Sequence, residues 1–171
     1  MAMLVLTVVV SWLWGQMLQP VCNEIQRPDL SLQEMVDVKL KVDDSERQGS
    51  APLRLSGREA TFVLREVLRL PMHVEVHDGA MTLDAAMPYR DACYNIHYEG
   101  SAEVREGVAT LAPSRFVIGE LDVAPWTEGD TELAQLEWVS PTVAEMMTHV
   151  ESLRIDGAEV VVDIDDVRMF R

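Results

Sequence analysis

The first 23 residues of the chain carry no charge, and this run constrains the fold more than any other feature. Residues 1–21 read MAMLVLTVVVSWLWGQMLQPV, and the first charged residue is Glu24. At a rise of 1.5 Å per residue, about 20 such residues form a helix that spans the ~30 Å hydrocarbon core of a bilayer. A helix also satisfies its own backbone hydrogen bonds in lipid. The run therefore predicts a transmembrane anchor over residues 1–22.

Two tryptophans late in the run, Trp12 and Trp14, predict the membrane interface, because indole rings favour the headgroup level. A cleaved signal peptide and a buried core helix are the alternatives. A signal peptide has a basic n-region, yet no Lys or Arg precedes Arg27. A core helix of a globular domain shows a polar face, which this run lacks. Whether the run is cleaved stays open.

The anchor interpretation divides the chain into three parts. Residues 1–22 form the anchor, 23–34 a connector, and 35–171 one soluble domain of ordinary size. A short N-terminus, one span and a large acidic domain are typical of a single-pass membrane protein with its domain outside the cytoplasm, in the periplasm if the source is bacterial.

The charge balance excludes some partners. The chain has 14 basic and 29 acidic residues, for a net charge of −15. Nucleic acid requires a basic surface, so no nucleic-acid partner is expected. The expected partners are membrane lipid around the anchor and other membrane-protein subunits. Two cysteines, Cys22 and Cys93, are too few to indicate a disulfide-stabilised fold. A disulfide between them needs an oxidising compartment and would connect the end of the anchor to the middle of the domain.

The pattern of the soluble part predicts strands and two helices. Alternating valines and leucine predict a half-buried strand over 35–42. Ser56 and Glu59 form an S-x-x-E capping box, which predicts a helix over 55–70 that Pro71 ends.

The pattern of the rest of the domain predicts mainly antiparallel hairpins. Asp78-Gly79 between two alternating runs predicts a hairpin over 72–86. Further strands and hairpins follow over 92–98, 101–112, 115–123 and 154–169, and the segment 131–153 predicts a helix broken at Pro141. The fold class is therefore α+β: an N-terminal transmembrane helix plus a curved antiparallel sheet of about eight strands packed on one or two helices.

No pattern in the sequence predicts catalysis or a metal centre. His73, Glu75 and His77 share one face of a strand, but the two histidines would lie ~13 Å apart and cannot share one ion. Nucleophile-elbow, phosphate-loop and CxxC motifs are missing from the sequence. We therefore expect no enzyme activity, no catalytic residues, no cofactor and no metal.

Methionines outside the anchor fit an adaptable apolar surface, although ordinary core packing is the favoured explanation for them. The alternative to core packing is a groove between helix and sheet that accepts an acyl chain or an apolar peptide. The residues predicted to line that groove are Phe62, Met72, Met81, Phe116, Met146 and Met147.

The order of the elements, with LSGREATFVL at 55–64 and FVIGEL at 116–121, resembles the membrane-anchored YpmS-type proteins and, more loosely, the tubular lipid-binding domains. The resemblance implies an extracytoplasmic domain with an apolar groove and without catalytic residues. Two functions follow. The first is a non-enzymatic accessory or assembly subunit of a membrane protein complex. The alternative is a membrane-anchored module that binds a lipid or another apolar ligand.

Overall fold

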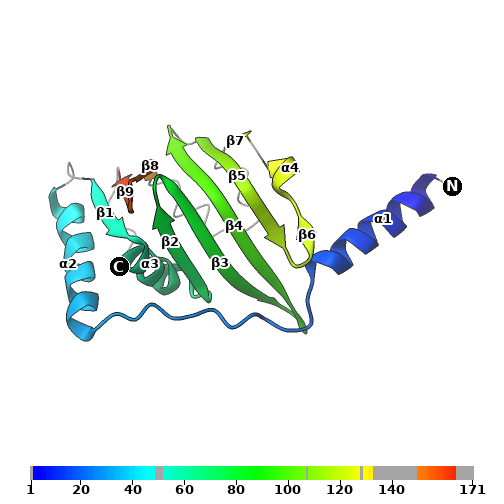
Figure 1. Ribbon diagram of the computed structural model, residues 1–171, viewed down its shortest axis with the longest axis horizontal. Coiled ribbons are helices and arrows are strands. Elements are labelled where there is room, and N and C mark those ends of the chain that lie inside the picture. The colour runs from blue at the N-terminus through cyan, green and yellow to red at the C-terminus, as the bar shows by residue number, and fades with distance from the viewer. Residues whose placement is uncertain (1, 49–51, 107, 128, 133–149, 165–171) are drawn as a thin grey trace.

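Antiparallel strands dominate the computed structural model, which describes residues 2–48, 52–106, 108–127, 129–132 and 150–164 (Figure 1). The elements, in order, are α1 (Ala2–Met17), α2 (Leu32–Gln48), β1 (Leu53–Ser56), α3 (Gly57–Leu68), β2 (Met72–His77), β3 (Ala80–Tyr89), β4 (Ala92–Arg105), β5 (Val108–Ile118), β6 (Leu121–Asp122), α4 (Ala124–Thr127), β7 (Gly129–Glu132), β8 (Val150–Asp156) and β9 (Glu159–Ile164).

All described strands belong to one nine-stranded sheet, and every pairing is antiparallel. The long strand β4 is its centre. Along most of its length β4 lies between β3 and β5, and near its end it pairs with β8. From β8 the sheet continues through β9 to β1, and from β3 it continues to β2. The short strands β6 and β7 both pair with β5.

Helix α3 packs inside the curve of this sheet and contributes to the main core. The predicted capping box is confirmed, because Glu59 N donates to Ser56 Oγ and Ser56 N donates to Glu59 Oε2. The predicted hairpin at Asp78-Gly79 is also confirmed, with both residues at positive φ as a tight two-residue turn requires. The buried members of the core are Val38, Val42, Leu53, Leu55, Ala60, Val74, Val76 and Val160.

The sheet is nearly closed into a barrel, and α3 covers one of its edges. The hydroxyl of Thr61 on α3 accepts a hydrogen bond from Val74 N at 2.8 Å, which occupies a backbone donor on the edge of β2. Gly79 N donates to Gly157 O at 3.0 Å, so the tip of the β2–β3 hairpin meets the tip of the β8–β9 hairpin. These contacts protect edge groups that would otherwise invite pairing with another chain.

The strand predicted over residues 35–42 is wrong, because these residues lie inside α2. A second capping box begins this helix: Ser31 N donates to Glu34 Oε2 at 2.7 Å, and Glu34 N donates to Ser31 Oγ at 3.3 Å. The helix buries Val38 and Val42, which are four residues apart. Valines at every second position also meet the i, i+4 spacing of a helix, so the cap decides between the two structures.

The helix predicted over 131–153 is wrong at both of its described ends. Thr131 lies in β7 and pairs with Ala109, while Val150 and Leu153 lie in β8. Val150 packs with Val104 in a second core cluster, so its apolar side chain serves a sheet rather than a helix. The predicted break at Pro141 lies outside the described residues, as do Met146 and Met147.

The predicted transmembrane anchor and the single-pass membrane localisation are wrong as well. Across the described part of the chain, none of the helices combines the length and the apolar character that crossing a bilayer requires. Helix α1 has 16 residues, about 24 Å, and ends at Met17 because the residues that follow pair with the body of the protein. The α+β class with a transmembrane helix is therefore corrected to a mostly-β, nearly closed antiparallel sheet with few helices.

Candidate functional site

Helix α1 is the most unusual surface of the described molecule. It extends away from the sheet instead of packing along it (Figure 1). No charged residue occurs in it, and its large apolar side chains are exposed to 52% at Val10, 60% at Trp12 and 50% at Trp14. Large exposed apolar side chains gathered on one element are typical of an interaction site rather than of a free surface.

Backbone hydrogen bonds fix the base of α1 to the sheet. Gln19 and Cys93 form an antiparallel bridge, in which the N–H of each donates to the carbonyl of the other at 2.8 Å. Glu120 N donates to Gln16 O at 2.8 Å, which satisfies a carbonyl of the last helical turn. The helix is therefore attached at two places, to β4 and to the β5–β6 turn.

Asn95 on β4 is the centre of this attachment. Its side chain is buried, and its Nδ2 donates to Gln19 Oε1 and to Val21 O, the latter at 3.0 Å. Its Oδ1 accepts from Asn23 N at 2.7 Å, and its own carbonyl accepts from Gly119 N at 2.8 Å. One buried amide thus satisfies polar groups of the segment that follows α1. We call the contacts of residues 16–23 with residues 93–95 and 119–120 the seam.

A disulfide between Cys22 and Cys93 completes the seam. The two Cα atoms are 5.1 Å apart, and 71 positions separate the cysteines in the sequence. The disulfide that the sequence left open is therefore formed, and it connects the end of the N-terminal run to the middle of the domain. No free cysteine remains. A bond of this kind persists in oxidising surroundings.

Close packing fixes the orientation of α1 further. Gly119 has a φ of +64°, and a Cβ at this position would lie 2.4 Å from Gln16 O. Only glycine therefore allows the β5–β6 turn to approach the helix end. Trp14 packs edge-on against Tyr94, with 6.3 Å between ring centroids, and Tyr94 contacts Tyr89.

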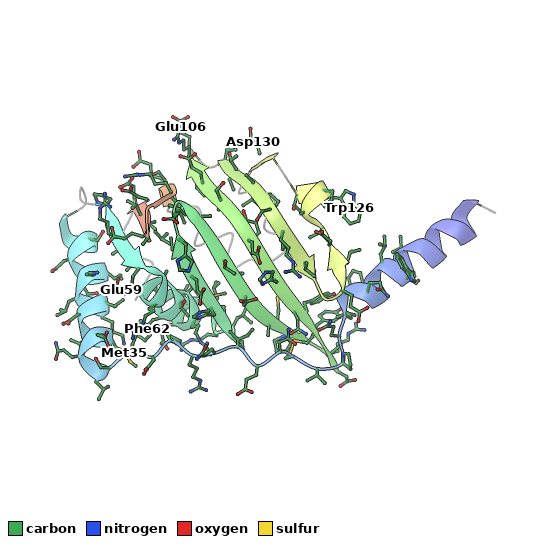
Figure 2. All side chains as sticks on the ribbon, viewed as in Figure 1. Met35, Glu59, Phe62, Glu106, Trp126 and Asp130 are labelled. Carbon is green, nitrogen blue, oxygen red and sulfur yellow. A yellow bond between two sulfur atoms is a disulfide. The ribbon has the colours of Figure 1, made fainter. Side chains whose placement is uncertain are left out.

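Of the four residues predicted for the apolar groove that the structure describes, three lie in or against the core. Phe62, on α3 (Figure 2), packs against the main core cluster, as does Met81, and Met72 is buried on β2. Phe116 packs edge-on against Tyr98 on the neighbouring strand, with 5.5 Å between ring centroids. Of the predicted site residues, Trp12 and Trp14 are both exposed on α1, where a separation of two residues places them on different sides of the helix.

A cleft beside β2 is lined by none of the residues predicted for the apolar groove. It has a volume of about 480 Å³, and its lining includes the charged or polar side chains of Arg58, His73 and Glu75. The described residues bring no three His, Cys, Asp or Glu side chains into an arrangement that could hold a metal ion. Glu75 lies instead between the two histidines, 3.1 Å from His73 Nε2 and 3.5 Å from His77 Nε2.

A second polar cluster lies on β3 and β4. His97 Nδ1 lies 2.7 Å from Asp84 Oδ1, and His97 Nε2 lies 2.7 Å from Glu99 Oε1. Two carboxylate acceptors call for two N–H donors, which is the protonated ring. The hydrogen bond to Asp84 raises the pKa of His97, and the bond to Glu99 adds to this effect against the opposing effect of burial. Arg115, 3.9 Å from Glu99, completes the cluster.

Replacing His97 should change how stability depends on pH. Because the pKa of His97 is raised on folding, its stabilising effect is complete below its unfolded value of about 6.5 and is lost as pH rises through the folded value. We expect His97→Gln to cost on the order of 1 kcal/mol at pH 5.5 and progressively less at higher pH, in urea titrations. His77→Gln, at a side chain that is 73% exposed, is the control. An equal cost at every pH would contradict the prediction.

The seam was not predicted from the sequence, because its partners are about 70 to 100 positions apart. Gly119 gave a signal, as a glycine within the strand predicted over 115–123, but Asn95 gave none. Neither a family model, nor a curated protein, nor a solved structure matches this chain. The resemblance to YpmS-type proteins therefore stays a prediction.

Proposed function

We propose that this chain is a non-enzymatic accessory or assembly subunit, in which α1 docks on an apolar surface of another protein. The observation that carries the proposal is the exposure of Val10, Trp12 and Trp14 on a helix without charge. Tryptophan is enriched among the residues that dominate the energy of protein–protein interfaces, because it buries a large area at a low cost in side-chain entropy.

The fixed base of α1 supports a docking role. A helix joined to its domain by a flexible linker would lose orientational freedom on binding, and this loss would weaken the complex. The bridge between Gln19 and Cys93, the Asn95 hydrogen bonds and the disulfide hold α1 in one direction before any partner arrives. A binding element held in this way retains more of its contact energy as affinity.

The acidic character of the body indicates the chemistry of the partner. With a net charge of −15, the body repels acidic surfaces, and exposed carboxylates at Glu24, Glu120 and Asp122 lie near the base of α1. The partner surface that fits is apolar at its centre, to accept α1, and neutral or basic at its rim.

Site-specific crosslinking tests the proposal. Benzoyl-phenylalanine placed at Val10 should yield a protein adduct on irradiation in the native host, whereas the same group at Trp126, a still more exposed position on α4, should not. Figure 2 places Trp126 on α4, outside α1. Val10→Glu should remove the native complex from size-exclusion chromatography, and Trp126→Glu should leave it. Adducts to phospholipid alone at residue 10, or equal protein adducts at both positions, would overturn the proposal.

A further inference from the structure

The two cysteines of the seam differ in their access to solvent. Cys22 lies in the exposed segment that follows α1, whereas Cys93 on β4 is 0% exposed. They meet where this segment passes the end of the β3–β4 hairpin (Figure 1). A dissolved reagent can therefore reach the pair through Cys22, whereas it reaches Cys93 only when the fold opens locally.

Hydrogen bonds on both sides of Cys22 hold it against Cys93 whether or not the two sulfurs are joined. Before it in the chain, Gln19 forms the backbone bridge with Cys93. After it, Asn23 N donates to Asn95 Oδ1 at 2.7 Å. These contacts involve no sulfur atom, so they form with the sheet and bring the two thiols of the reduced chain together. Closing the disulfide is then a reaction between groups already in place, which makes it fast.

We propose that Cys22 is the site at which a disulfide reagent acts on this chain, with Cys93 as the resolving thiol. The Cys22 thiolate attacks one sulfur of the reagent, forms a mixed disulfide and releases the other half of the reagent as a thiolate. The Cys93 thiolate then attacks Cys22 Sγ, forms the Cys22–Cys93 bond and releases the second half. Two protein thiols are thereby oxidised, with loss of two electrons and two protons, and one reagent disulfide is reduced to two thiols.

The charge around Cys22 indicates the class of reagent. Exposed Glu24 is two positions away, so the two Cα atoms are at most about 7 Å apart, less than the screening length of about 8 Å at physiological salt. The whole chain has a net charge of −15. An anionic disulfide is repelled from such a surface, and a cationic one is attracted to it. Cys22 therefore takes neutral or cationic disulfides in preference to anionic ones.

Two variants with one cysteine each test the order of the steps. Cys93→Ala leaves Cys22 alone, and Cys22→Ser leaves Cys93 beneath a side chain of nearly unchanged size. In native buffer, cystamine should modify the first variant at least about 30-fold faster than the second in mass spectrometry, because the buried thiol reacts only through local opening. In concentrated urea, where both thiols are accessible, the two rates should agree within about threefold.

The unmodified, oxidised chain provides a second test that does not depend on how the variants fold. Cysteamine, the thiol form of cystamine, should attack Cys22 Sγ and release the Cys93 thiolate. Acid quenching at early times, followed by peptide mapping, should therefore find the mixed disulfide on Cys22. A mixed disulfide on Cys93 under native conditions would overturn the inference, and so would equal rates for the two variants in native buffer.

The preference for the reagent is measured on Cys93→Ala. After division by the rate for the small neutral thiol N-acetylcysteine amide, cationic cystamine should react at least about tenfold faster than anionic oxidised glutathione, and high salt should remove the difference. Equal normalised rates at low salt would show that the assigned class of reagent is wrong. None of these measurements involves the docking of α1, so their outcome is independent of the proposed function.

Discussion

Reducing the disulfide between Cys22 and Cys93 will lower the free energy of unfolding by about 4 kcal/mol. The bond closes a loop between residues 71 positions apart, and a loop of this length restricts the unfolded chain by about that amount in the chain-entropy model. Cys93 is fully buried, so its reduced thiol would stay at the same place in the fold and the hydrogen bonds of the seam would remain. The loss therefore falls mainly on the unfolded state.

Urea titrations with and without a phosphine reductant measure this effect. The midpoint should fall on reduction, and the dependence of the unfolding free energy on urea should steepen, because the unfolded chain without the crosslink exposes more surface. Thiol titration of the denatured chain should give no thiols before reduction and two after it. Cys22→Ala should lose the same stability and should no longer respond to the reductant. A wild-type chain as insensitive to reductant as this variant would contradict the disulfide.

Local chemistry made the turns and one helix predictable. Asp78-Gly79 and Gly157 adopt positive φ, which their residue types favour strongly whatever lies around them. The capping box of Ser56 and Glu59 joins residues three apart, so it too is visible in the sequence. Features that depend only on neighbouring residues along the chain can therefore be predicted from the sequence.

The strand wrongly predicted over 35–42 shows where local patterns become ambiguous. Valines at 36, 38 and 42 fit a strand of period two, and Val38 and Val42 also fit one face of a helix. Ser31 and Glu34 carry the decisive signal, the same S-x-x-E pattern that identified α3. The alternating pattern alone does not distinguish a strand from a helix at these positions, and the cap in front of it does.

The error over the N-terminal run has a different cause. Its composition does favour lipid, but Gln19, Asn23 and Cys22 pair with residues more than 70 positions away. These contacts divide the run into a helix of 16 residues and a segment that belongs to the sheet. Pairings between such distant residues cannot be predicted from the local sequence. Only Trp12 and Trp14 of the candidate site were therefore predicted.

Asn95→Asp will destabilise the folded chain by about 3 kcal/mol or more at neutral pH. The substitution keeps the shape and the oxygen that accepts from Asn23 N, but it replaces the donor Nδ2 with a second oxygen. That oxygen would face two acceptors, Gln19 Oε1 and Val21 O, at a buried position. Removing a buried hydrogen-bond partner and burying an unpaired charge each cost more than one lost hydrogen bond on the surface.

Asn23→Asp is the matched control, because it adds the same charge a short distance away on an exposed side chain and should change stability by less than about 0.5 kcal/mol. The deficit of Asn95→Asp relative to wild type, measured in urea, should shrink at pH 4. Burial and the facing oxygens raise the pKa of the introduced carboxyl, and its protonated form again offers a donor. Hydrogen exchange should also speed up at the amides of Gln19 and Cys93, which form the bridge at the base of α1. Equal effects of the two substitutions would mean that Asn95 does not organise the seam.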